Sequence, residues 1–366
     1  MNDIRRILII GNNTRHIACS AKRAGYTVYV IDHFGDVDVR RCVDGVIVLD
    51  SHCDISDSKL NEHIKASDVD AVVLGAGFET RRVNLSEKIL LGNDPVVANR
   101  VSDKEWLAKE LNKLGIPHPR IYANGNIEYP AIIKPKQGMG GRLCRIIHEG
   151  DVPPDYIAQE CLVGNFASVS VLSTEDDAIS LAVNEQLIGV PWLGTAFPFR
   201  YCGNITPFND EHGDEMRQIA EGIILHLRLI GSNGVDFIIT KDGPVVLEVN
   251  PRFQGSLDTV ELATGVNLFD AHVQAISGVL KRNVKAQCFA TKMVVFATDD
   301  MIVRTSLDID GIADIPHIGS KICARAPIAT ALGTGIDRKS ALHAAMKKAL
   351  MIRTQAPSIP SRHGQV

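Results

Sequence analysis

Apolar runs alternate with helical patterns along the first hundred residues. Residues 7–10, 28–31, 46–49 and 71–74 are apolar throughout, and amphipathic segments separate them. Strands of this kind predict a parallel sheet that is covered on both faces. Ligands of such sheets bind at the carboxyl ends of the strands. We therefore expect three segments to converge there, namely residues 11–15, 32–36 and 75–79.

The pattern changes after residue 100. Ser102 is placed to cap a helix that Gly115 would close. Further helices are predicted over residues 211–227, 267–279 and 339–351. Short strands are predicted over residues 131–134, 143–147, 157–160 and 168–172, and a hairpin over residues 234–250. The last residues, rich in proline and glycine, are expected to be frayed.

Composition narrows the class of protein. A chain of 366 residues predicts two or three domains. Its net charge is −4, from 39 basic and 43 acidic residues that are well mixed, so neither nucleic acid nor a membrane is an expected partner. None of the eight cysteines forms a C-x-x-C pair, and no signal peptide or membrane span is evident. We expect reduced thiols in a cytoplasmic protein that acts on small molecules.

The predicted hairpin carries a candidate metal site. A three-residue loop centred on Asp242 pairs Thr240 with Pro244 and Asp236 with Glu248. Alternation along the strand then places Asn250 on the same face. Two opposed carboxylates repel each other unless a cation lies between them, and Mg²⁺ prefers oxygen ligands. The alternative is an exposed hairpin whose polar face points to solvent.

A strand that ends in Lys134 leads into a glycine-rich segment with Gly138, Gly140 and Gly141. Glycines allow backbone N–H groups to approach phosphate oxygens closely, and the lysine adds positive charge. Taken alone, this segment fits an ordinary glycine-rich hairpin turn better than a phosphate site. Lys104, in the first turn of its helix, taken alone fits a solvated surface residue.

These residues together resemble the ATP-grasp superfamily. The resemblance rests on Asp103-Lys104, Lys134-Pro135 with its glycines, Gln159-Glu160, Asp236 and Glu248-Val249-Asn250-Pro251-Arg252 in this order. It covers residues 102–279 well and is greatest for a microbial branch of predicted carboligases. Residues 318–335 and the helix after them are similar to the closing domain of biotin carboxylase-like members. The expected fold is α/β and α+β: a Rossmann-like N-terminal domain (1–100), an ATP-grasp domain (101–284), a C-terminal closing region (285–353) and a tail (354–366).

The resemblance implies a role for each residue of the motif. Lys104 and Lys134 would contact the phosphates of ATP, under the loop of Gly138, Gly140 and Gly141. Asp236, Glu248 and Asn250 would hold Mg²⁺ or Mn²⁺, and Arg252 would reach a phosphate or an acyl phosphate. The hinge that meets the adenine would consist of Gln159, Glu160, Cys161 and Leu162. Residues 165–168 lack the carboxylate that would bind the ribose, and Glu185 is the substitute.

The implied activity is ligation of a carboxylate to an amine through an acyl phosphate. The alternatives are a bicarbonate-using carboxylase or an acyl-phosphate-forming kinase with the same ATP site, and a non-catalytic nucleotide-binding protein. The segment 189–206 is expected to help exclude water, or else to be an ordinary surface loop. Arg15, Glu79 and Arg200 are the candidates for contacts with the carboxylate or the amine acceptor. A homodimer is left open.

Overall fold

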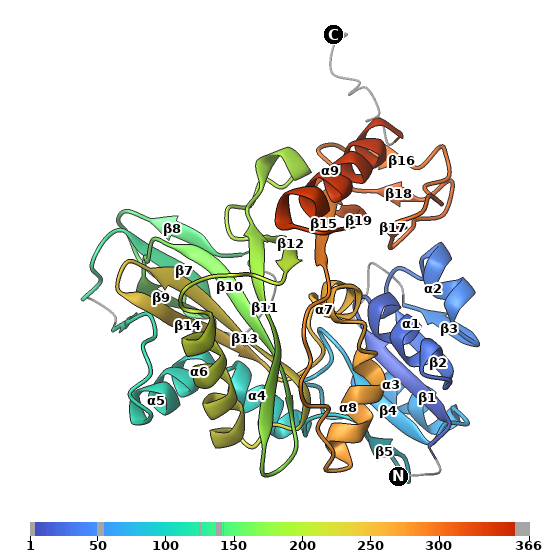
Figure 1. The fold of residues 1–366 in the computed structure, drawn as a ribbon, viewed down its shortest axis with the longest axis horizontal. Coiled ribbons are helices and arrows are strands. Elements are labelled where there is room, and N and C mark those ends of the chain that lie inside the picture. Colours follow the sequence, from blue (N-terminus) through green and yellow to red (C-terminus); the bar gives the residue numbers. More distant parts are fainter. Residues whose placement is uncertain (1–3, 50–54, 124–125, 137–140, 142, 356–366) are drawn as a thin grey trace.

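The computed structural model describes residues 4–49, 55–123, 126–136, 141 and 143–355 (Figure 1). The N-terminal parallel sheet lies on one side, at the right of the view, and the strands of the predicted nucleotide-binding region lie on the other. The helix at the C-terminal end packs on the part of the large sheet that residues 289–296 and 327–335 form. In the part of the chain that is described, no helix is both long and apolar enough to cross a membrane.

The N-terminal sheet is parallel, as predicted, with strand order β3-β2-β1-β4-β5. Alternate residues of β1 face opposite ways: Ile7 and Ile9 belong to one buried cluster, Leu8 and Ile10 to another. The segments after β1 and β4 meet, because the amide of Asn12 donates to the carbonyl of Ala76 at 2.9 Å. The elements are β1 (Arg6–Gly11), α1 (Arg15–Arg23), β2 (Thr27–Asp32), α2 (Val37–Cys42), β3 (Gly45–Val48), α3 (Asp57–Ala66), β4 (Ala71–Leu74) and β5 (Ile89–Leu90).

Two helices connect this sheet to the next one, and the predicted cap between them was wrong by one residue. Ser102 ends the first helix, and Asp103 caps the second by accepting from the amides of Glu105 and Trp106. A carboxylate that satisfies two N–H groups explains the shift. A four-stranded antiparallel sheet of order β6-β9-β7-β8 follows. The elements are α4 (Pro95–Ser102), α5 (Lys104–Lys113), β6 (Ile121–Tyr122), β7 (Ala131–Pro135), β8 (Arg145–Ile147) and β9 (Tyr156–Glu160).

An eight-stranded sheet of order β14-β13-β10-β11-β12-β15-β19-β17 forms the rest of the molecule. It crosses the domain boundary predicted at 284/285, because β12 pairs with β15, so that division stays a prediction. The strands are β10 (Asn165–Ser173), β11 (Ala178–Ile188), β12 (Tyr201–Thr206), β13 (Gly231–Thr240), β14 (Gly243–Asn250), β15 (Phe289–Phe296), β17 (Ile312–Ala313) and β19 (Pro327–Gly335).

Helices cover this sheet. Apolar side chains of α6 and of α9 pack against its strands in two separate buried clusters. The last helix continues to Gln355, one residue beyond the predicted start of the tail, and residues 356–366 lie outside the described part. The remaining elements are η1 (Pro191–Leu193), α6 (Gly213–His226), α7 (Leu257–Thr264), α8 (Leu268–Ile276), β16 (Met301–Ile302), β18 (Lys321–Ile322) and α9 (Arg338–Gln355).

Candidate functional site

The hairpin of β13 and β14 opposes Asp236 and Glu248, as predicted, although the turn differs. Thr240 pairs with Gly243 rather than with Pro244, so the loop has two residues and not three. A β-bulge next to Asp236 then adds one residue on β14 and restores the predicted register. The two carboxylates therefore face each other because two deviations from the simple hairpin cancel.

Amide groups surround the carboxylate of Asp236. Its two oxygens accept from Gln186 Nε2 at 3.0 Å and from Asn250 Nδ2 at 3.1 Å. Burial, followed by the neighbouring Glu248, raises the pKa of Asp236 well above its ordinary range. Burial is the larger cause, the second carboxylate adds to it, and Asn250 and Arg252 oppose the shift.

The donor set suits a hard divalent cation. Asp236, Glu248 and Asn250 offer oxygen ligands, which Mg²⁺ and Mn²⁺ prefer, and phosphate and water usually complete such sites. The side-chain oxygen of Asn250 accepts from Arg252 Nη2 at 3.0 Å, so this arginine lies next to the proposed ligands. Among the described residues no group of three or more His, Cys, Asp or Glu could hold a metal. The proposed set has two carboxylates and an amide.

A cavity of about 220 Å³ lies between the four-stranded sheet and the hairpin. Lys104 and Lys134 line it from one side, and Asp236 and Glu248 from the other. Burial lowers the pKa of Lys134 to about 8; Glu248 opposes this shift and Lys104 adds to it. Lys104 is 9% exposed and is therefore not the solvated residue of the alternative interpretation. The residues predicted to meet phosphates and metal thus share one cavity.

The remaining lining of the cavity is largely apolar, as a planar base requires. The predicted hinge residues Gln159, Glu160 and Leu162 line it, whereas Cys161 is not among the lining side chains. Sequence reasoning gave no role to several apolar lining residues: Ile132, Leu143, Phe166, Ile188, Ile238 and Leu247.

Gly141 closes over this cavity. Its φ is 65°, and a Cβ atom there would lie 1.9 Å from the carbonyl oxygen of Phe199. Glycine is therefore required for conformation and for space. Phe199 and Tyr201, from the segment predicted to exclude water, also line the cavity. The predicted glycines Gly138 and Gly140 lie outside the described residues.

The structure places Glu185, predicted to bind the ribose, outside the lining of the cavity, so that assignment stays a prediction. Its carboxylate accepts two hydrogen bonds from Arg338, at 2.6 and 2.7 Å, and it does not line the cavity. The next residue, Gln186, does. Because side chains alternate along a strand, a shift of one residue exchanges the two faces.

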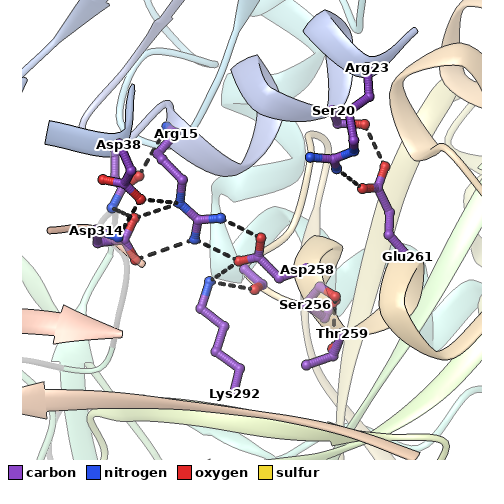
Figure 2. Close-up of polar contacts among 12 residues, drawn as sticks. Arg15, Ser20, Arg23, Asp38, Ser256, Asp258, Thr259, Glu261, Lys292 and Asp314 are labelled. Carbon is purple, nitrogen blue, oxygen red and sulfur yellow. Dashed lines mark hydrogen bonds and ion pairs between the residues drawn. The ribbon is translucent and has the colours of Figure 1, made fainter. Parts of the chain in front are cut away.

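Two of the three substrate candidates, Arg15 and Arg200, are not among the residues that line the cavity. Arg15 is buried in an ion-pair cluster with Asp258 and Asp314 (Figure 2). Arg200 donates to the carbonyl of Arg325 at 2.6 Å and lies 4.0 Å from the ring centroid of Phe296. Buried ion pairs and cation–π contacts of this kind occupy the charged group with protein partners. The assignment of Arg15 and Arg200 to substrate stays a prediction that these contacts do not support.

Glu79, the third candidate, contacts the predicted catalytic arginine. Its Oε1 lies 2.6 Å from Arg252 Nε, and both side chains border a small second pocket. That pocket lies where residues 75–79 follow β4, at the carboxyl edge of the parallel sheet. The structure thus brings Glu79 and Arg252 together beside Asn250 of the proposed metal set.

Comparisons with known proteins agree with this geometry. Residues 101–256 match the family model of the ATP-grasp domain. An uncharacterised protein of Methanocaldococcus jannaschii is 26% identical, over 89% of this chain and 88% of its own length. A carbamoyl phosphate synthase large chain of Methanoculleus marisnigri is also 26% identical, over 52% of this chain but 20% of its own length. The chain thus spans about a fifth of that enzyme.

The fold is also found among solved structures. The biotin carboxylase domain dimer of Hydrogenobacter thermophilus 2-oxoglutarate carboxylase, in complex with MgADP, ADP and bicarbonate, has a TM-score of 0.76. The match covers 95% of this chain and 90% of the other, at 14% identity. At this identity the similarity concerns the fold, and the mixed α/β architecture predicted from the sequence is confirmed.

Proposed function

Since residues 101–256 form an ATP-grasp domain, we propose that this protein is a ligase that activates a substrate carboxylate with Mg·ATP and joins it to an amine or similar nucleophile. One observation supports the proposal above others: Lys104 and Lys134 line the same cavity as Asp236 and Glu248. Positive groups opposite metal-binding carboxylates form the charge arrangement that a metal-bound triphosphate requires.

In the proposed complex the phosphates lie between the two lysines, and the base lies in the apolar end of the cavity. Asp236, Glu248 and Asn250 would hold Mg²⁺ or Mn²⁺, which would neutralise phosphate charge when bound. The solved neighbour from Hydrogenobacter thermophilus contains MgADP, which supports the same nucleotide and metal here. Gln186, now hydrogen-bonded to Asp236, contacts the proposed metal set and lines the cavity.

The proposed reaction has two steps. A carboxylate oxygen of the substrate attacks the γ-phosphorus, and the bond from that phosphorus to ADP breaks with its electrons leaving on ADP. The amine then attacks the acyl carbon, inorganic phosphate leaves, and the amine loses a proton to solvent. Lys134 and Arg252 stabilise the negative charge that develops on the transferred group. A single preorganised contact of this type contributes about 3–4 kcal/mol to lowering the barrier.

Water must be excluded while the acyl phosphate exists. We assign this role to the contact between Gly141 and Phe199, which joins the glycine segment to residues 189–206. Tyr201, at the end of that segment, lines the same cavity. Closure at this place would cover the phosphates without displacing the lysines beneath them.

A second candidate is carboxylation, because the solved neighbour also holds bicarbonate. The two functions differ in product. Hydroxylamine traps an acyl phosphate of an organic acid as a hydroxamate, whereas a carboxylase releases phosphate with bicarbonate as its acid. Bicarbonate-dependent phosphate release without hydroxamate from any organic acid would favour carboxylation.

The test of the ATP site combines calorimetry and turnover. Mg·ATP should bind to the wild type, and Glu248→Gln should abolish ADP formation with an unchanged circular dichroism spectrum, because one metal-binding carboxylate is lost. Glu128→Gln is the control, since its ion pair with Arg120 is exposed. Near-normal turnover of the Glu248→Gln variant would remove the metal assignment. Absence of binding at millimolar Mg·ATP would overturn both enzymatic functions.

A further inference from the structure

The ion pair of Glu79 and Arg252 joins the N-terminal sheet to the end of the metal hairpin. Its two side chains are 10% and 12% exposed, and the N–O distance is 2.6 Å. The second oxygen of Glu79 accepts from the amide of Gly77 at 2.6 Å. Arg252 also donates to Asn250 and to the carbonyl of Phe253. Both charges are thus buried, and each is the other's ionic partner.

A hollow borders this pair. The pocket lined by Glu79, Arg252 and apolar side chains such as Leu74, Leu91 and Phe253 has a volume of about 10 Å³, which holds about one water molecule. A ligand that uses the charged groups here must therefore separate them and occupy the space that opens. The position agrees with the general rule that parallel sheets bind ligands beyond the carboxyl ends of their strands.

The charge of the pair restricts the ligand. A simple carboxylate would take Arg252 and leave Glu79 buried without an ionic partner, and a simple amine would do the reverse. Leaving one member of a buried pair without compensation is strongly unfavourable. A molecule with both an ammonium and a carboxylate replaces one ion pair by two, so every charge stays paired. This selection works through the penalty on the wrong ligands as much as through new contacts.

We propose that the carboxylate-donating substrate is a free amino acid, with its carboxylate on Arg252 and its ammonium on Glu79. The inference rests on the proposed ligase function and names the substrate class for it. Arg252 lies 3.0 Å from the Asn250 oxygen, so a carboxylate on Arg252 lies beside the proposed metal and γ-phosphate. The ammonium is held on the side of the N-terminal sheet and stays protonated. A second molecule must therefore supply the nucleophilic amine.

The experiment is a hydroxamate assay with Mg·ATP and hydroxylamine. Standard L-amino acids and their D-forms are compared with the N-acetyl derivative of each and with the corresponding deaminated acids. At least one free amino acid should give hydroxamate and ADP, with kcat/KM at least tenfold above that of its N-acetyl and deaminated forms. The proposal would be overturned if the N-acetyl or deaminated acids reacted with equal or greater kcat/KM, or if no amino acid gave hydroxamate.

The variant Glu79→Gln separates substrate binding from a structural role. It should raise the KM for the amino acid at least tenfold and lower its preference over the deaminated acid, while the Kd of Mg·ATP changes less than twofold. Equal losses for both acids would mean that Glu79 positions Arg252 structurally and would overturn the proposed contact. Glu128→Gln serves as the matched control, with unchanged kinetics expected. If the wild type did not bind Mg·ATP, the proposed function itself would be overturned.

Discussion

The cluster around Asp258 should make a large contribution to stability (Figure 2). Its carboxylate accepts from Arg15 at 2.6 and 2.8 Å and from Lys292 at 2.8 Å. The side chains are between 7% and 9% exposed. The cations hold the pKa of Asp258 well below its ordinary range, against the effect of burial. The variant Asp258→Asn keeps the shape of the side chain and removes its charge.

Two estimates give the magnitude. Removing one partner of a buried ion pair costs about 3–5 kcal/mol. Hydrogen bonds to charged groups contribute about 1.5–3 kcal/mol each, and the three here are not additive because they share one carboxylate. We expect the Asp258→Asn variant to lose about 3–5 kcal/mol of free energy of unfolding at pH 7. The loss includes the cost of two cations left buried.

Urea-induced unfolding followed by circular dichroism measures this loss. The control is Asp308→Asn, because Asp308 and its partner Arg41 are 45% and 59% exposed. Exposed pairs contribute about 0–1 kcal/mol, so the control should unfold nearly as the wild type does. A loss below about 1 kcal/mol for Asp258→Asn, or equal losses for both variants, would refute the reasoning from burial.

Two further predictions concern Gly141 and Asp36. The variant Gly141→Ala should weaken Mg·ATP binding at least tenfold in calorimetry, because the new Cβ would meet the Phe199 carbonyl. The control is Gly222→Ala, since a Cβ at Gly222 would have no atom within 4 Å. Equal affinities of the two variants for Mg·ATP would contradict the proposed closure. Burial, then nearby aspartates, raise the pKa of Asp36 to about 8. The folded protein therefore holds a proton that the unfolded chain releases, so wild-type stability relative to Asp36→Asn should fall by at most about 1.4 kcal/mol per pH unit from about pH 4 to 8. If the difference in free energy of unfolding between the wild type and Asp36→Asn stayed constant over this pH range, the prediction would be contradicted.

Much of the architecture follows from local pattern. Strands such as residues 7–10 are apolar on both faces, and in the structure alternate residues enter two different cores. The pairing of Asp236 with Glu248 was also predicted from alternation and a turn. The pairing depends on a β-bulge next to Asp236 that no local sequence feature predicted. Register is determined by packing across strands as well as by the turn between them.

Other parts of the site could not be predicted, because they depend on contacts between distant segments. Arg15 is a plausible ligand contact when read beside a glycine turn, yet its partners Asp258 and Asp314 lie more than 240 residues away in the chain. Glu185 and Gln186 are adjacent in sequence, yet Glu185 binds Arg338 of α9 and Gln186 lines the cavity. Candidates near the motif were identified by type, but their orientation came from tertiary structure.

Two buried arginines connect the N-terminal sheet to the rest of the chain, and burial alone does not distinguish their roles. Arg15 has carboxylate partners on both sides and borders neither described pocket. Arg252 has one carboxylate partner, borders a pocket and contacts Asn250 of the proposed metal set. In the proposed complex a ligand could replace the one carboxylate partner of Arg252 beside the reacting phosphate, whereas any ligand of Arg15 would compete with three carboxylates, Asp38, Asp258 and Asp314. Adjacent space and the contact with Asn250 are therefore the observations on which our proposal for Arg252 rests.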